Sequence, residues 1–299
     1  MRVQILLILV AVVVISFTAG CVQQPGPTTP TPTATTVPPT TVPSTTVPQA
    51  DTIKLGSTPL GLVLTDAKGM TLYYFAKDIP SAGTSACSGA CSAVWPTFSV
   101  STISVSAPLD ASDFSMFTRA DNTTQVAYKG YPLYYFQNDT KPGDTNGEGI
   151  LGLWAVMKQD YAIMVEQQSS VGTFLADEYG KTLYVLTRDS TGTSTCNGSC
   201  ATTWPPFGAD ALSAPSLVKN SDFNYISRSD GMNQTAYKGR PLYFYSGDQK
   251  PGNINGNGVL GVWFVANVTG AVPATPTPTP TQTTRPPTTS PGGGGGYGY

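Results

Sequence analysis

The fold of this chain is decided by one ten-residue stretch, Gly69-Met70-Thr71-Leu72-Tyr73-Tyr74-Phe75-Ala76-Lys77-Asp78. The same pattern of an opening glycine, an aromatic-rich middle and a closing aspartate occurs again at residues 130–139, 180–189 and 239–248. Glycine accepts the positive φ of a tight turn, and aspartate caps a strand end through its short polar side chain. Four copies of such a unit predict a fold built from β-hairpins.

The four units belong to two longer copies of one sequence. Residues of the first copy recur 109 positions later, as the pairs Cys87/Cys196, Cys91/Cys200, Trp95/Trp204, Phe114/Phe223, Arg119/Arg228, Gln125/Gln234, Tyr128/Tyr237 and Trp154/Trp263. Before the cysteines the offset is 111, because the loop there is two residues shorter in the second copy. This repeat predicts two tandem homologous domains, at residues 52–160 and 161–269.

Each domain is expected to be all-β. Residues 114–119, 124–128 and 132–136 predict a three-strand meander, because they are rich in Tyr, Phe, Thr and Val and are separated by short turns. No long segment has the 3.6-residue periodicity of an amphipathic helix. A domain of about 100 residues is small but large enough to fold alone.

The N-terminus has the features of an export signal. A positively charged start, Met1-Arg2-Val3-Gln4, precedes the apolar run 5–17. That run is shorter than the roughly 20 residues of a membrane-spanning helix, so a retained anchor is the weaker alternative. The following Ala19-Gly20-Cys21 resembles a lipoprotein cleavage site, although Thr18 stands where an aliphatic residue is usual. We therefore expect a signal peptide at 1–20 and a lipid on Cys21 that attaches the protein to the membrane.

Thr/Pro-rich segments flank the two domains. Residues 27–48 contain 7 Pro and 10 Thr and no charged or aromatic residue, so they cannot form a core. A proline-rich stalk at 21–51 would lift the domains on the order of 90 Å from the lipid. A second such tract and a Gly/Tyr-rich end make up the tail at 270–299. This tail is expected to be disordered, and adhesion to an envelope polymer is the alternative for its Gly/Tyr end.

The cysteines also indicate export. Of the five, Cys21 is assigned to the lipid, which leaves Cys87 with Cys91 and Cys196 with Cys200. Paired cysteines form disulfides in an oxidising compartment. The alternative is a redox or metal-handling role, but the chain has no histidine, so a tetrahedral site would need all four thiolates to meet across the two domains.

Composition excludes several functions. The chain has 16 basic and 18 acidic residues and no long charge run, so a nucleic-acid partner is not expected. The lack of histidine removes Ser-His-Asp and Cys-His catalysis. No phosphate-binding loop or pair of catalytic acids is recognisable, and we expect no enzyme activity, cofactor or metal.

Two motifs each allow a functional and a structural interpretation. Asp144, Asn146 and Glu148 alternate as in half of a calcium loop, but the second copy has asparagine at all three positions, which favours turn geometry. The repeated tyrosines could form a ligand surface or part of the core. They are Tyr73, Tyr134, Tyr184 and Tyr243.

Glycosylation sequons occur at predicted turns or strand ends of both domains. Their acceptor residues are Asn122, Asn138, Asn197, Asn233 and Asn267.

The motif Tyr-x-(Phe/Trp/Tyr)-x-x-Asp occurs at residues 73–78, 134–139 and 243–248, whereas the fourth copy has Leu186 at its aromatic position. This pattern resembles a family of predicted prokaryotic lipoproteins, also described as a secreted repeat of unknown function. The resemblance implies export, lipid attachment and the repeat, and it supplies no activity. Several members of that family place histidine after the last tryptophan, where this chain has Ala155 and Phe264, so a role for that histidine cannot transfer.

Together these features predict a lipid-anchored protein of the cell surface with a non-catalytic binding or structural role in the cell envelope. Its expected partner is a polysaccharide or a surface protein. The alternative is a redox or metal-handling lipoprotein that uses the two Cys-x-x-x-Cys pairs.

Overall fold

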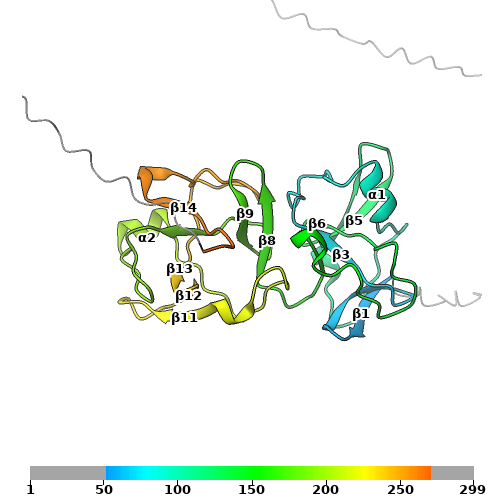
Figure 1. Cartoon of the computed structure of the whole chain (residues 1–299), viewed down its shortest axis with the longest axis horizontal. Coiled ribbons are helices and arrows are strands. Elements are labelled where there is room, and N and C mark those ends of the chain that lie inside the picture. The colour runs from blue at the N-terminus through cyan, green and yellow to red at the C-terminus, as the bar shows by residue number, and fades with distance from the viewer. Residues whose placement is uncertain (1–51, 271–299) are drawn as a thin grey trace, which may run out of the picture. The chain divides into compact units, whose positions relative to one another are not determined.

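The computed structural model describes residues 52–270, which belong to one compact unit (Figure 1). The predicted signal peptide, the lipid site Cys21, the stalk at 21–51 and the tail beyond residue 270 lie outside these residues. The described part consists mostly of short strands in small antiparallel sheets. The predicted all-β fold is therefore confirmed.

The first repeat contains three small sheets. The strands β1 (Ile53–Thr58) and β2 (Gly61–Asp66) form a hairpin, and β3 (Tyr73–Phe75) pairs with β7 (Trp154–Val156). The meander consists of β4 (Phe114–Thr118), β5 (Thr124–Tyr128) and β6 (Tyr131–Pro132). The short helices are α1 (Ala90–Val94), η1 (Ala111–Asp113) and η2 (Ile150–Gly152).

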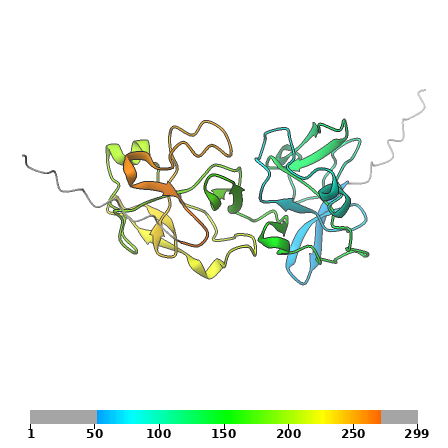
Figure 2. The ribbon, with the colours of Figure 1, turned by 45° about the horizontal axis from the view of Figure 1, so that its top comes forward.

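The second repeat has the same order and pairing. The strands β8 (Ile163–Gln168) and β9 (Gly172–Asp177) form its hairpin, and β10 (Tyr184–Leu186) pairs with β14 (Trp263–Val265). Its meander consists of β11 (Phe223–Ser227), β12 (Asn233–Tyr237) and β13 (Arg240–Pro241). The short helices are α2 (Ser199–Thr203), η3 (Asn220–Asp222) and η4 (Val259–Gly261). Figure 2 shows both repeats from a second direction, with the blue hairpin of β1 and β2 in the first and the orange strand β14 in the second.

The third strand of the meander is shorter than predicted, because the chain changes partner there. Beyond β6, Tyr134 leaves the meander and pairs with Tyr73 of the other unit in the same repeat. The N–H of Tyr73 donates to the carbonyl of Tyr134 at 2.8 Å, and the N–H of Tyr134 donates back at 3.0 Å. The two Gly-to-Asp units of a repeat therefore meet at their first tyrosines.

Side-chain hydrogen bonds reinforce this pairing of the two units in the first repeat, because the tyrosines exchange partners between the units. The hydroxyl of Tyr73 donates to Asp139 Oδ2 at 2.7 Å, and that of Tyr134 donates to Asp78 Oδ2 at 2.6 Å. Each tyrosine thus binds the aspartate that closes the other unit. The second oxygen of each aspartate accepts a loop N–H, from Ala86 at 2.6 Å for Asp78 and from Asn146 at 2.9 Å for Asp139.

The second repeat reproduces the exchange. Tyr184 donates to Asp248 and Tyr243 to Asp189, both at 2.6 Å. The backbone bonds between the two tyrosines measure 2.8 and 2.9 Å. All four tyrosines have no exposed surface (0%), so their hydroxyls must find partners inside the protein, and the aspartates accept from them. The hydroxyls of Tyr134 and Tyr243 also contact Ser85 Oγ at 2.5 Å and Ser194 Oγ at 2.7 Å.

Both faces of the central strand are buried. Leu72 and Tyr74 face a cluster with Leu133, whereas Tyr73 and Phe75 face a cluster with Trp154. This is the alternation that strand geometry predicts. In each repeat two tryptophans stack in this second cluster, Trp95 on Trp154 and Trp204 on Trp263, with ring centroids 3.8 Å apart in both.

The strand β8 of the second repeat packs on the first. Met164 joins the core of the first repeat, and the N–H of Gln167 donates to the carbonyl of Ala76 at 2.6 Å. Between them lies Glu166, which is 2% exposed and accepts a hydrogen bond from the Tyr131 hydroxyl at 2.9 Å. Burial raises the pKa of the Glu166 carboxyl to about 8, with a further contribution from the nearby charge of Asp177.

We expect Tyr134→Phe to lower the free energy of unfolding by about 1.5–3 kcal/mol, because it leaves the buried carboxylate of Asp78 without its hydroxyl donor. Urea denaturation with intact disulfides measures this change. The matched control is Tyr225→Phe on β11, where the ring is 43% exposed. The control should change stability by less than about 0.5 kcal/mol, and equal losses in the two variants would contradict the assigned role of the Tyr134 hydroxyl.

The buried Glu166 should make stability depend on pH. Because its pKa is raised on folding, its contribution is complete below the unfolded-state pKa and is lost as the pH rises through about 8. The melting temperature should therefore fall from about pH 6 to about pH 9, and Glu166→Gln should reduce this fall, since the amide does not ionise. Parallel profiles for the two proteins, measured by differential scanning fluorimetry, would contradict this interpretation.

Candidate functional site

The structure places the four repeated tyrosines in the core. The sequence left a ligand surface open for Tyr73, Tyr134, Tyr184 and Tyr243, and that expectation is corrected, because none of the four has exposed surface. Burial, followed by the paired aspartate, raises the pKa of each hydroxyl above its ordinary value. These hydroxyls therefore stay protonated and serve as hydrogen-bond donors inside the fold.

The cysteines form the predicted disulfides, Cys87–Cys91 and Cys196–Cys200, each with a Cα–Cα distance of 5.2 Å. Cys87 and Cys196 are buried beside the stacked tryptophans. The four sulfurs are thus paired within their own repeats and do not come together in one site.

Two buried arginines lie beside these disulfides, and their role was not predicted from the sequence. Arg119 donates to the carbonyl of Cys87 and to Gln125 Oε1, both at 2.5 Å. Arg228 makes the equivalent bonds to Cys196 and Gln234 at 2.9 Å. The recurrence of Arg and Gln with the cysteines was the available signal. The arginines tie the disulfide loop to the meander.

The glycine-rich loop uses its polar side chains as acceptors for its own backbone. Asp144 Oδ2 accepts from the N–H groups of Thr140 and Lys141 at 3.0 and 3.1 Å. In the second repeat Asn253 Oδ1 accepts from Gln249 and Lys250 at 3.2 and 3.1 Å. An amide oxygen replaces a carboxylate here because only an acceptor is needed.

An amide also replaces a carboxylate as acceptor at the end of the loop. Glu148 Oε2 accepts from the N–H of Val156 at 2.6 Å, and Asn257 Oδ1 accepts from Val265 at 3.1 Å. The other oxygen of Glu148 accepts from Ser216. Among residues 52–270 no group of three or more His, Cys, Asp or Glu is arranged to hold a metal. The loop geometry therefore explains the half calcium motif.

The sequon asparagines lie at accessible positions. Asn122, Asn138, Asn197 and Asn233 are exposed, and Asn267 is partly buried. Asn267 Oδ1 also accepts from Thr269 N and Oγ1 at 2.9 and 2.8 Å. Sugar attachment at these residues stays a prediction.

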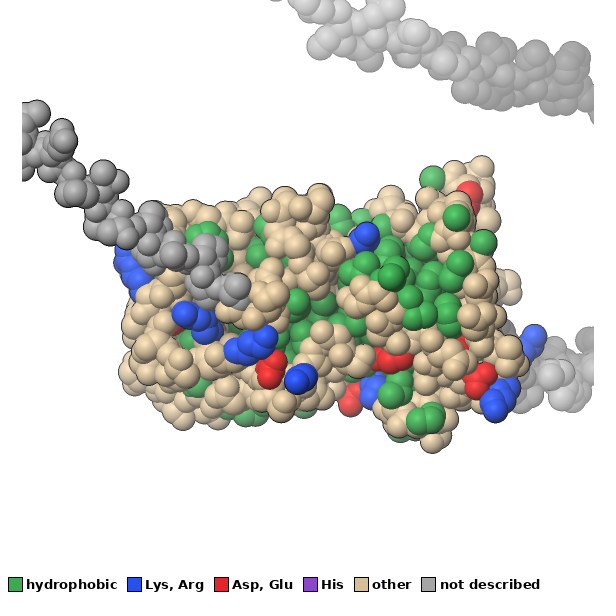
Figure 3. Space-filling view, viewed as in Figure 1, with side chains coloured by type: hydrophobic (Ala, Val, Ile, Leu, Met, Phe, Trp, Pro, Cys, Tyr) green, Lys and Arg blue, Asp and Glu red, His purple; other side chains and the backbone are tan. Residues whose placement is uncertain are grey.

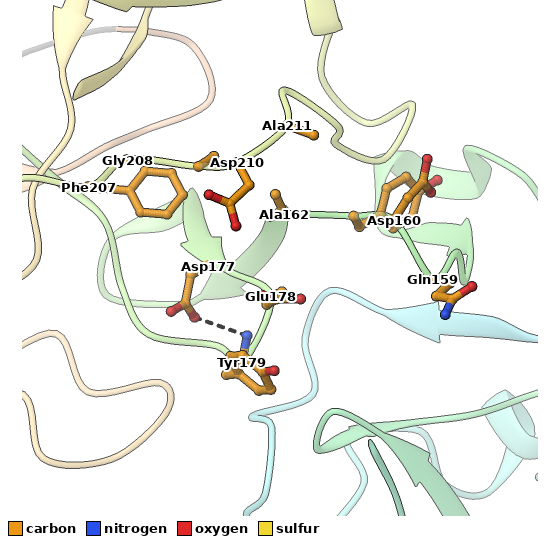
Figure 4. A pocket seen from close by; sticks show the side chains of 12 residues that line it. Gln159, Asp160, Ala162, Asp177, Glu178, Tyr179, Phe207, Gly208, Asp210 and Ala211 are labelled. Carbon is orange, nitrogen blue, oxygen red and sulfur yellow. Dashed lines mark hydrogen bonds between the residues drawn. The ribbon is translucent and has the colours of Figure 1, made fainter. Parts of the chain in front are cut away.

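A pocket of about 380 Å³ lies beside the end of β9 in the second repeat (Figure 4). Three segments line it, at 159–162, 177–179 and 207–211. They contribute aromatic and acidic side chains, namely Tyr161, Tyr179, Phe207, Asp160, Asp177, Glu178 and Asp210. Elsewhere, on the face that Figure 3 shows, charged side chains are few and scattered.

Only some of the polar groups of the pocket form hydrogen bonds or ion pairs within the protein. Asp177 Oδ1 accepts from the N–H groups of Tyr179 and Lys181 at 3.0 and 2.8 Å. Burial raises the pKa of Asp177. Glu178 forms an ion pair with Lys129 of the first repeat, and the ring of Tyr179 is 52% exposed. The pocket therefore offers an aromatic surface with hydrogen-bond acceptors, which is a common composition for small-molecule sites.

Comparison with known proteins gives one match. A family model described as "secreted repeat of unknown function" matches residues 54–99, 115–158, 167–207 and 224–267, more than half of the chain. Each matched segment contains one of the four Gly-to-Asp units, so each repeat holds two family units. No curated protein and no solved structure matches. None of the helices within 52–270 has the length and hydrophobicity that a membrane span requires.

We expect calcium to leave this protein unchanged. At about 5 mM, above the dissociation constants of weak extracellular calcium sites, the melting temperature should shift by less than about 1 °C. Asp144→Asn, which copies the second repeat, should alter the free energy of unfolding by less than about 0.5 kcal/mol. A calcium-dependent rise in melting temperature that Asp144→Asn removes would restore the calcium hypothesis.

Proposed function

The chain belongs to the family of secreted repeats of unknown function, and from this membership we propose that it is an exported, lipid-anchored protein of the cell surface that binds a partner and catalyses no reaction. The expected lipid on Cys21 and the stalk at 21–51 would hold the two repeats away from the membrane. Sugar on the exposed sequon asparagines fits the same location.

The observation that carries this proposal is the disulfide in each repeat. Both bridges lie in equivalent, buried surroundings, and such bonds persist in oxidising compartments outside the cytosol. Each closes a short loop, which by the loop-closure estimate contributes roughly 2 kcal/mol. This suits a small domain that must remain folded outside the cell.

The buried polar groups of the two repeats are engaged within the scaffold and are not available for catalysis. The aspartates that close the four units are each held by a tyrosine hydroxyl, and the buried arginines are held by glutamine and backbone carbonyls. General acid–base chemistry needs a titratable group that reaches a substrate. The rival function is redox or metal handling by the cysteine pairs, and it requires those disulfides to open.

Intact mass and thiol counting on the natively exported protein test the proposal. We expect a chain that begins at lipid-modified Cys21, with no free thiol before reduction, four after reduction and no bound metal. A mild dithiol couple should leave the disulfides closed, and reduction should lower the melting temperature. Free thiols with stoichiometric metal, or rapid exchange with the couple, would favour the rival function, and an unmodified N-terminus at Met1 would exclude the lipid anchor.

A further inference from the structure

The pocket beside β9 has a chemistry that the first repeat lacks. Its acidic and aromatic groups stand where the other copy has different residues, since Glu178, Tyr179 and Asp210 correspond to Ala67, Lys68 and Ser101. The segments that carry these residues have equal lengths in the two repeats. The differences therefore concern side chains on one backbone design.

A fourth difference frees a carboxylate oxygen. In the first repeat Asp66, the counterpart of Asp177, accepts a hydrogen bond from the Tyr135 hydroxyl through Oδ2 at 3.0 Å. The counterpart of Tyr135 is Phe244, which has no hydroxyl. Asp177 keeps the two backbone bonds to Oδ1, and its Oδ2 has no hydrogen-bond partner within the described residues. The nearby Lys181 places its Nζ over the Phe244 ring, 4.6 Å from the centroid, and forms no ion pair with Asp177.

The pocket thus selects a ligand that donates hydrogen bonds. Figure 4 shows Asp177 and Tyr179 on one side and Phe207 and Asp210 on the segment opposite. Four carboxylates contribute to the lining, and one of them is neutralised by Lys129, so an anionic ligand would be repelled. Sugar hydroxyl and amino groups donate to carboxylates, and the apolar face of a sugar ring packs on aromatic rings such as that of Tyr179.

We propose that this pocket binds a saccharide unit that carries hydroxyl or amino groups and no acidic group. The volume of about 380 Å³ lies within the range of small-ligand sites. The proposal deepens the proposed function, on which it rests, by naming the class of its partner. Asp177 and Asp210 accept hydrogen bonds from the sugar, and Tyr179 packs on the ring.

The test uses the purified, natively exported full chain and two trisaccharides of equal size, one of glucosamine and one of galacturonic acid. Ligand-observed NMR titration should show saturable binding of the glucosamine trisaccharide and none of the galacturonic acid trisaccharide. The triple variant Glu178→Ala, Tyr179→Lys, Asp210→Ser gives the pocket the side chains of the first repeat, so it should fold. It should bind at least about tenfold more weakly.

A second variant tests the freed oxygen without removing any group from the pocket. Phe244→Tyr restores the hydroxyl that holds Asp66 in the first repeat, so it should weaken binding by a similar factor. The control is Asp121→Asn, an exposed carboxylate of the first repeat, which should bind as the unaltered protein does. Absence of glucosamine binding, equal binding of the galacturonic acid trisaccharide, or affinity unaltered by the triple variant would each overturn the proposal. None of these outcomes bears on the lipid or the disulfides of the proposed function, because intact mass and thiol counting measure those separately.

Discussion

The exchanged tyrosine–aspartate hydrogen bonds join the two family units of each repeat in one buried core. Tyr73 has no exposed surface, and its hydroxyl reaches Asp139, which lies in the other family unit of the same repeat. An unpaired buried hydroxyl or carboxylate carries a penalty of several kcal/mol, so both groups are buried at low cost only where the two units meet. The two matched segments 54–99 and 115–158 therefore share one buried hydrogen-bond network. The stacked tryptophans, the disulfide and the buried arginine surround this pair.

Much of this fold could be predicted from recurrence alone. The four Gly-to-Asp units, the two repeats and the cysteine pairs are visible because identical residues return at fixed offsets. The exchange itself could not be predicted. Within one unit Asp78 lies five residues after Tyr73 and resembles a local cap, whereas its tyrosine partner is Tyr134, 56 positions away. The sequence also did not decide whether the tyrosines are buried, because the same alternation occurs in a strand with one buried face and in a strand with two.

The pocket could not be predicted for a different reason. Recurrence identifies what the two copies share, and what they share is the scaffold. The pocket depends on positions where they differ, such as Tyr135 against Phe244 and Ser101 against Asp210. Taken singly, each of these differences is an ordinary substitution. Only the fold brings Asp177 together with Asp210 in one lining, across 33 positions of chain. A comparison of the two copies for differences at otherwise matching positions would have been the useful signal.

The place where the copies diverge also follows from the energetics of hydrogen bonding. The tyrosine bonds to Asp78, Asp139, Asp189 and Asp248 lie in the interior, where these aspartates are 2–8% exposed, and both repeats keep them. Asp66 and Asp177 are only half-buried, so a carboxylate oxygen there can be hydrated when its tyrosine is lost. Phenylalanine in place of tyrosine at position 244 therefore costs the fold little stability. Loss of the Tyr184 hydroxyl would cost more, because it would leave an oxygen of the buried Asp248 without its donor. A duplicated scaffold of this kind can therefore change its half-exposed acceptors more freely than its buried ones, because a freed oxygen that water reaches does not unfold the protein.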